Sequence, residues 1–385
     1  MTMVPAVARA WCDARRVLAV RLDNLGDVLM TTPALAALRE SLPRASLTLL
    51  ASPAGAALAP HLPMVDEVIA YRAPWVAHPL LAHVPVGADD RALVERLAAC
   101  GFDAAVVFTT CTQSALPAAL VCALAGIPER LAYSRENPYR LLTTWVPESD
   151  AVAPGMRHEV ERQLRLVARI GCTTADERLR FRLRPQDRAA LARVRDVVDF
   201  DPSRPYIVVH PGASAPSRRW PPERFGAAAA RLAEATGRSI VFTGQAQEQP
   251  LVDAARDACR APSVTFAGRL DLGAFAALVA GADLLLTNNS GPVHLAAALG
   301  TRVVDCYALT NPQHTPWRVP ARVLSHEVPC RDCLKSVCPQ GHHGCLLGVT
   351  TEQVVQAALE LLAGAPPARL RRTSRSREAA VEAGA

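Results

Sequence analysis

The chain has 385 residues, of which 50% are hydrophobic and 20% charged, and its formal net charge is +6. This length predicts two domains with apolar cores, and the composition excludes a wholly disordered, collagen-like or coiled-coil protein. Five arginines against two glutamates in residues 369–385 carry +3 of that charge, which leaves the folded part too weakly basic for a nucleic-acid-binding protein.

The first half of the chain alternates short β-branched runs with helical patterns. Strands are predicted at residues 17–22, 45–51, 66–71 and 103–108, and helices after the turn at Asp23–Asp27 and at 90–100, 114–125 and 158–170. This order is typical of an α/β domain built on a parallel sheet.

A second series begins after a polar, Pro-containing connection at residues 199–205. Strands are predicted at 206–210, 239–243, 264–267, 283–287 and 303–307, and helices at 222–235, 248–258, 272–280, 292–299 and 350–362. Thr350 and Gln353 have the spacing of a capping box at the start of the last helix. We therefore expect two doubly wound domains, 1–198 and 199–363, with ligands bound at the carboxyl ends of their strands.

Residues 364–385 are rich in Pro, Ala, Ser and Arg, which predicts a disordered tail. Its arginines could hold the chain near an anionic membrane surface, or could only keep this end of the chain soluble. Arg9 and Asp13 interrupt the N-terminal apolar stretch before it could serve as a signal peptide, and no apolar run is long enough to span a membrane. The sequence thus predicts a cytoplasmic protein.

Four familiar catalytic motifs are missing from the sequence. There is no G-x-G-x-x-G after the first strand, and no G-x-x-x-x-G-K-[ST], H-E-x-x-H or G-x-S-x-G. Their absence argues against a nicotinamide dehydrogenase, a P-loop nucleotidase, a zincin protease and a serine hydrolase.

A polar turn ends the predicted strand at 283–287. Asn288, Asn289, Ser290 and Gly291 lead into a helix whose first turns contain His294. The unpaired N–H groups at such a helix start attract anions. The same residues could equally form a plain helix cap.

Two more polar turns follow neighbouring strands of the second domain. Ser214 and Arg218 lie in the first, and a guanidinium fork there could clamp a diphosphate, unless the segment is an exposed loop anchored by Trp220. Gly244 and Glu248 lie in the second, where a carboxylate could hold ribose hydroxyls. Together the three turns predict a nucleotide-diphosphate site.

Asp27 is the candidate base of the first domain. It follows Gly26 at the start of the first long helix, so it should face the second domain, and the helix N-terminus keeps a carboxylate there ionised. It could accept a proton from an attacking hydroxyl, or it could be an ordinary acidic residue of a first helical turn. Asp23 competes for the same role.

Four of the eleven cysteines lie within sixteen residues, at Cys330, Cys333, Cys338 and Cys345. This spacing could supply a tetrahedral structural site for Zn or Fe. Reduced cysteines packed in a loop, or a redox-labile pair, are the alternatives. A catalytic metal is disfavoured because four thiolates would close its coordination sphere.

Several blocks of the chain resemble glycosyltransferase family nine, the ADP-heptose:lipopolysaccharide heptosyltransferases. The matching blocks are RLDNLGDVLMTTPAL at 21–35, HPGASAPSRRWP at 210–221, Phe242–Gly244 and TNNSGPVHLAAAL at 287–299. The likeness runs in order from residue 16 to 362, and the cysteine cluster is familiar from members of the family.

The resemblance implies a GT-B fold, in which two Rossmann-like domains face a central cleft with the sugar nucleotide in the second domain and the acceptor in the first. By position, Asp27 matches the family's proposed catalytic base and Arg218 a basic residue that contacts the donor phosphates. Asn289 stands where several members have Asp, so it can offer only hydrogen bonds, and Glu248 corresponds loosely to the acidic residue near the ribose. Gly26, Ser214, Gly244, Asn288, Ser290, Gly291 and His294 complete the expected substrate-binding set.

The expected reaction is a single inverting displacement, in which a heptose moves from an ADP-sugar to a lipopolysaccharide core with no catalytic cofactor. Arg218, Ser290 and the helix from Gly291 would stabilise the departing diphosphate without a divalent metal. One alternative is another sugar nucleotide or another acceptor, such as a protein, and a second is a non-catalytic sugar-nucleotide sensor or scaffold. An epimerase is disfavoured because the block at 25–35 does not resemble that family.

Overall fold

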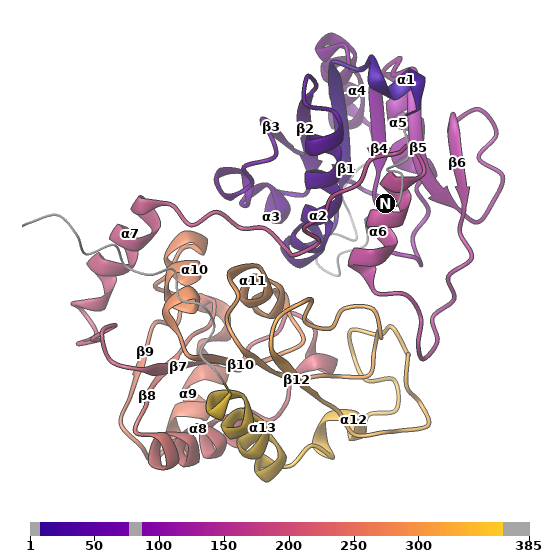
Figure 1. Ribbon diagram of the computed structural model, residues 1–385. Coiled ribbons are helices and arrows are strands. Elements are labelled where there is room, and N and C mark those ends of the chain that lie inside the picture. Colours follow the sequence, from indigo (N-terminus) through magenta and orange to yellow (C-terminus); the bar gives the residue numbers. More distant parts are fainter. Residues whose placement is uncertain (1–7, 77–86, 365–385) are drawn as a thin grey trace, which may run out of the picture.

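The computed structural model describes residues 8–76 and 87–364, and these form two α/β domains (Figure 1). The N-terminal sheet contains β1 (Arg16–Arg21), β2 (Ser46–Ala51), β3 (Glu67–Ala70), β4 (Ala104–Val107), β5 (Glu129–Ser134) and β6 (Thr144–Pro147), in the order β3-β2-β1-β4-β5-β6. All of its neighbouring strands are parallel. Around it lie α1 (Arg9–Cys12), α2 (Leu25–Ser41), α3 (Pro53–Ala56), α4 (Ala88–Cys100), α5 (Leu116–Leu124) and α6 (Glu159–Ala168).

The C-terminal sheet repeats this plan. It contains β7 (Tyr206–His210), β8 (Ser239–Phe242), β9 (Ser263–Thr265), β10 (Leu284–Asn288), β11 (Val303–Cys306) and β12 (Ala321–Leu324), in the order β12-β11-β10-β7-β8-β9, again all parallel. Its helices are α7 (Pro185–Arg195), α8 (Pro222–Thr236), α9 (Gln249–Ala258), α10 (Leu272–Gly281), α11 (Gly291–Leu299), α12 (Gly344–Leu347) and α13 (Thr351–Ala363).

Both faces of each sheet are covered, which explains why the central strands are apolar throughout. Along β1, Val17 and Ala19 belong to one core cluster of the N-terminal domain, and Leu18 and Val20 belong to the cluster on the opposite face. Successive side chains of a strand point to opposite faces, so a strand buried on both sides needs an unbroken apolar run.

The expected strands and helices are present, with ends that differ by a few residues. The capping box at the last helix is confirmed, because Thr350 Oγ1 accepts from the Gln353 N–H at 3.2 Å and Gln353 Oε1 accepts from the Thr350 N–H at 2.8 Å. Strands β5, β6 and β12 and helices α1, α3, α7 and α12 were not predicted. Strand β5 begins with the charged residues Glu129 and Arg130, and the edge strands β6 and β12 are four residues long and only partly buried, so their hydrophobic patterns are weak.

The chain crosses from the first domain to the second earlier than the expected boundary at 198/199. Helix α7 precedes that boundary, yet it packs on α10 of the C-terminal domain, as Figure 1 shows. Leu191 of α7 is buried in one cluster with Tyr206 and Ala274 of the second domain. The chain therefore crosses between the domains before α7, because the apolar side of this helix is covered only there.

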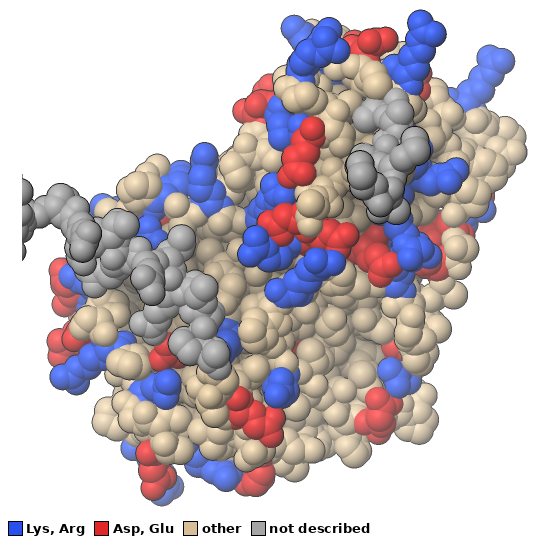
Figure 2. Space-filling view, viewed as in Figure 1, with Lys and Arg blue, Asp and Glu red and all other residues tan. Residues whose placement is uncertain are grey.

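Helices α2 and α11 pack on each other across the domain boundary, and their first turns approach closely. A Cβ atom built on Gly26 would lie 2.9 Å from His294 Cδ2, so this close approach needs glycine at position 26. The loop after β11 also contacts the N-terminal domain, through the bonds of Thr315 to His158 and of Gln313 to Arg157. Basic and acidic side chains are interspersed over the face in Figure 2. None of the helices in the described ranges combines the length and hydropathy that crossing a membrane requires. The predicted tail lies, apart from Gly364, outside the described residues.

Candidate active site between the domains

A cavity of about 680 Å³ lies between the two domains, at the carboxyl ends of β1, β7, β8 and β10. The first domain contributes the turn before α2 and the first turn of α2. The second contributes the loop after β7, the turn after β8 and the start of α11. Of the residues predicted to bind substrate or catalyse, the cavity is lined by Gly26, Asp27, Ser214, Arg218, Gly244, Glu248, Asn289, Ser290, Gly291 and His294.

Asn288 differs from this expectation, because it lies behind the cavity wall and not in it. Its side chain is fully buried, its Nδ2 donates to the Pro211 carbonyl at 2.7 Å, and its Oδ1 accepts from the Trp220 N–H at 2.9 Å. Asn288 therefore ties the loop after β7 to the end of β10. Its place in the polar turn could not reveal that the side chain points inward.

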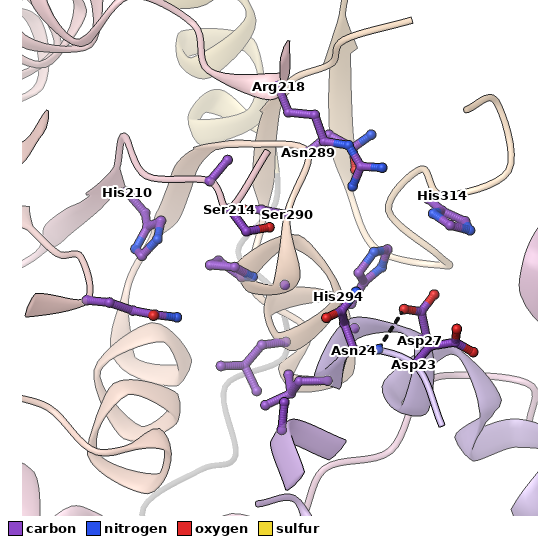
Figure 3. A pocket seen from close by; sticks show the side chains of 18 of the residues that line it. Asp23, Asn24, Asp27, His210, Ser214, Arg218, Asn289, Ser290, His294 and His314 are labelled. Carbon is purple, nitrogen blue, oxygen red and sulfur yellow. Dashed lines mark hydrogen bonds between the residues drawn. The ribbon is translucent and has the colours of Figure 1, made fainter. Parts of the chain in front are cut away.

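Asp27 points into the cavity from the first turn of α2, with its side chain 13% exposed. Its Oδ2 accepts from the Asn24 N–H at 3.1 Å, and its Oδ1 lies 3.3 Å from Arg21 Nη2. In Figure 3, Asp23 and Asp27 lie on one side of the pocket and Arg218 and Asn289 on the other, with His294 between them. This arrangement fits a base facing a bound anion.

Arg21 is the centre of a buried ion cluster behind Asp27. The guanidinium is fully buried, and its Nη1 bonds to Glu159 Oε1 at 2.9 Å while its Nε lies 2.9 Å from Asp23 Oδ2. Burial opposes the charge of Arg21, but Asp23, Glu159 and Asp27 raise its pKa above the ordinary value. Glu159 comes from α6, which packs on α2.

Asp23 is a weaker candidate for the base than Asp27. Its Oδ1 accepts from Gln113 Nε2 at 2.6 Å, and its Oδ2 pairs with Arg21. Burial raises the pKa of Asp23, with Arg21 acting in the opposite direction. With both oxygens engaged by the protein, Asp23 serves better to hold neighbouring groups than to take a proton from a substrate.

The donor side of the cavity offers hydrogen-bond donors that the described protein does not use. Arg218 ends the short 3₁₀ turn η3 (Pro216–Arg218), and its Nε is buried without a hydrogen-bond partner among the residues described. Ser290 precedes α11, and Ser290 and Gly291 line the same space. Gly291 has an N–H at the start of this helix, whereas Pro292 has none and the Val293 N–H donates to the Ser290 carbonyl. A guanidinium and a helix N-terminus together form a site for a phosphate or diphosphate.

Glu248 lines the cavity from the turn after β8. Its Oε2 accepts from the Gln245 N–H at 2.8 Å and lies 3.5 Å from His210 Nε2. Burial would raise the pKa of Glu248, but His210 and the Gln245 N–H outweigh it and lower that pKa. The backbone of Gly212 passes directly over this carboxyl, since a Cβ built there would lie 2.3 Å from it.

His294 and His314 are two buried imidazoles in the wall of the cavity, and their ring centroids are 6.4 Å apart. Burial lowers the pKa of His294 well below its usual value, and burial followed by the Arg218 charge lowers that of His314 to about 3. Both rings are therefore neutral at pH 7. His294 Nδ1 and His314 Nε2 have no hydrogen-bond partner within the described part of the chain.

Sequence reasoning missed three residues of this site. His314 lies in the loop after β11. Ligands bind at the carboxyl ends of parallel strands, so a search of this loop for polar side chains would have found it. His210 stood inside a recognised block but received no role. Glu159 had one signal, since an arginine such as Arg21 within a buried apolar strand needs an anionic partner.

The four clustered cysteines lie in the segment that precedes α13. Burial raises the pKa of Cys345, and the charges of Cys338, Cys333 and Cys330 act in the same direction. Cys330 Sγ lies 3.5 Å from His342 Nε2. Nevertheless, no group of three or more Cys, His, Asp or Glu side chains within residues 8–76 and 87–364 is arranged to hold a metal ion. The structural metal site stays a prediction.

Comparison with known proteins agrees with this architecture. The model of a family described as "Glycosyltransferase family 9 (heptosyltransferase)" matches residues 91–343. Lipopolysaccharide heptosyltransferase 2 of Escherichia coli (strain K12) is 27% identical over 357 residues, which cover 90% of this chain and 98% of the relative.

Two solved structures share the fold over most of their length. A family 9 glycosyl transferase from Veillonella parvula has a TM-score of 0.74 at 21% identity, covering 93% of this chain and 99% of its own. The E. coli ADP-heptose lps heptosyltransferase II has a TM-score of 0.68 at 23% identity, covering 90% and 98%. The expected fold, two doubly wound domains facing a cleft as in GT-B enzymes, is confirmed.

Proposed function

Because the chain belongs to glycosyltransferase family 9, we propose that it transfers a heptose from ADP-heptose to a lipopolysaccharide core acceptor, with inversion at the anomeric carbon. The observation that carries this proposal is that Asp27 of the first domain and Arg218 of the second line one cavity. The choice of heptose, ADP and lipopolysaccharide in this proposal follows the names of similar proteins.

In the proposed reaction, an acceptor hydroxyl attacks the anomeric carbon of the donor while Asp27 takes the hydroxyl proton. The C1–O bond to the diphosphate breaks in the same step, through an oxocarbenium-like state. The electron pair of that bond leaves with ADP, and Arg218, Ser290 and the helix that starts at Gly291 stabilise its added negative charge. The products are the glycosylated acceptor, ADP and a proton.

The donor test uses the full-length protein, a lipopolysaccharide core that lacks the heptose, and ADP-, UDP- and GDP-activated sugars. We expect ADP release and acceptor glycosylation only when ADP-heptose and the acceptor are both present, and we expect turnover to persist in a chelator. Activity with a UDP- or GDP-sugar alone would refute the donor assignment, and an absolute need for magnesium would refute the metal-free leaving group. Donor binding with no transfer to any acceptor would favour a sensor.

Arg218→Gln tests the donor phosphate contact. We expect it to weaken ADP binding about tenfold to a hundredfold, because one charged hydrogen-bonding group to phosphate is lost. Arg231→Gln is the matched control, since Arg231 pairs with Glu352 on the surface of α8, away from the cavity. Equal ADP affinities of the two variants, measured by calorimetry, would remove Arg218 from the site.

A further inference from the structure

A second cavity, of about 290 Å³, lies in the N-terminal domain beside the first. Its walls come from the carboxyl ends of β1 and β4, the start of α5, and Trp75. Asp23, Thr112 and Gln113 line both cavities, so these three residues form the wall that the two share.

The sheet topology places this cavity where a doubly wound domain binds a ligand. The chain leaves β1 for β2 on one side and later returns to β4 on the other, so the connections after β1 and β4 diverge and leave a crevice. In the second sheet, β7 and β10 hold the equivalent place, and the turns after them line the donor side of the first cavity. Each domain thus has one crevice at its switch point.

The described lining of the second cavity contains neither Lys nor Arg. Its one charged residue is Asp23, whose carboxylate is already paired with Arg21 and Gln113. A phosphate or carboxylate group would therefore meet a carboxylate and no lining cation, which disfavours an acidic ligand.

The remaining lining combines hydroxyl and amide groups with one aromatic face. Thr109 and Thr112 supply hydroxyl groups, while Trp75 and the ends of β1 and β4 supply apolar surface. Gln113 and Ser114 also line the cavity, but the Gln113 amide bonds to Asp23 and to the Thr110 N–H, and the Ser114 hydroxyl donates to Glu136. Trp75 is partly exposed, and its ring lies 5.8 Å from that of Tyr71. A pyranose has the matching chemistry, since it carries hydroxyls around its edge and C–H groups on a face that can pack on an indole ring.

We propose that this second cavity binds a neutral sugar ring of the acceptor. The proposal rests on the proposed glycosyl transfer and names its acceptor subsite. A ring held here lies beyond the wall of Asp23 and Gln113, next to the turn that leads into α2. The sugar joined to that ring then extends into the first cavity, where Asp27 accepts the proton of the attacking hydroxyl.

The test compares two small probes, methyl heptopyranoside and the methyl glycoside of a hexuronic acid, as inhibitors of transfer by the wild-type protein. We expect the neutral glycoside to compete with the acceptor and not with ADP-heptose, and the uronate to bind about tenfold more weakly, because it would place a charge beside Asp23 without a cation. Equal inhibition by both probes, or competition with ADP-heptose, would overturn the proposal.

Substitution of Trp75 locates the binding. We expect Trp75→Ala to raise the acceptor KM and the inhibition constant of methyl heptopyranoside about tenfold, with the donor KM unchanged, and Trp75→Phe to restore most of the loss. Trp145→Ala, on the surface of β6, is the matched control. An unchanged acceptor KM in folded Trp75→Ala would place the acceptor elsewhere.

Calorimetry separates this proposal from the function on which it rests. If the wild-type protein transfers no heptose from ADP-heptose, the proposed function fails. Binding of methyl heptopyranoside, with ADP present, to wild-type and to Trp75→Ala protein still tests the cavity. Loss of that binding only in Trp75→Ala would support a neutral-sugar site, and no binding to the wild type would refute it.

Discussion

At the scale of single residues, the site depends on one buried cation. Arg21 contacts Asp23, Asp27 and Glu159, and Glu159 is 138 residues away in the chain. The three carboxylates carry more negative charge than the single Arg21 guanidinium that they contact can balance. Burial raises the pKa of Glu159, and its neighbour Asp27 acts in the same direction. Arg21 thus holds Asp27 Oδ1 on the cavity side while the other two acids hold Arg21.

Asp27→Asn keeps the shape of the side chain but removes its ability to take a proton. We expect kcat to fall by about 10²- to 10⁴-fold, the usual contribution of a general base, with little change in the donor KM. Initial rates measure this loss. Asp89→Asn, an exposed acid in the first turn of α4, should keep full activity. Normal turnover of Asp27→Asn would exclude Asp27 as the base.

The ion cluster predicts an unequal effect of removing its members. Arg21→Met leaves Asp23 and Asp27 without their paired cation and Glu159 with only Arg162, 3.9 Å away, so it should cost about 3–5 kcal/mol of unfolding free energy. Glu159→Gln removes one of the excess negative charges and should cost less. Denaturant unfolding measures both, and Glu161→Gln on the exposed side of α6 should stay within about 1 kcal/mol. A Glu159→Gln protein as unstable as Arg21→Met would contradict this account.

At the scale of elements, helix starts position most of the site. The first turn of α2 presents Asp27, and the start of α11 presents Gly291 and His294. Both helices follow central strands, β1 and β10, whose carboxyl ends are fixed by pairing on both sides. Gly26 lets these two helix starts approach each other, because any side chain there would collide with His294.

The segment between β12 and α13 contains the four clustered cysteines and the prediction of a structural metal. If the thiolates bind Zn or Fe, metal analysis of protein purified without added metal should find about one ion per chain. Cys333→Ser should then lose the ion and Cys100→Ser should keep it. Metal-free wild-type protein that is fully folded would leave reduced cysteines or a redox-labile pair as the explanation.

At the scale of the whole molecule, the interface between the domains buries two neutral histidines. In the unfolded chain a histidine has a pKa near 6.5, whereas in the folded protein that of His314 is about 3. Between these two values the unfolded state binds more protons, so the stability from His314 is complete above pH 6.5 and is lost as the pH falls toward 3. His294 acts in the same direction.

This linkage predicts that acidification destabilises the protein. Between pH 7 and pH 5, His314 alone should lower the unfolding free energy by about 2 kcal/mol. Asp23 and Glu159 act oppositely, because their pKa values are raised and their contributions are lost as the pH rises through those values. Denaturant unfolding of wild type and His314→Gln at both pH values isolates the histidine. Equal losses in the two proteins would refute the assignment.

Local patterns in the chain were enough to identify nine of the twelve strands that the structure describes, the helix starts at the site, and the polar groups of the cavity that stand in the turns before α2 and α11 and after β7 and β8. A buried parallel strand needs a continuous apolar run, and a polar turn after such a strand must lie at the sheet edge where ligands bind. Asp27, Arg218, Ser290 and Glu248 were all found in this way, because each stands in the connection that follows a strand, at most eight residues after its end.

Long-range packing decided the rest. Whether Asn288 points into the cavity or behind it depends on Trp220 and Pro211, far away in the chain. The pairing of Glu159 with Arg21 and the docking of α7 on the second domain likewise depend on which surfaces meet in three dimensions. Hydrophobic periodicity and turn chemistry describe only near neighbours, so they carry no information about such partners.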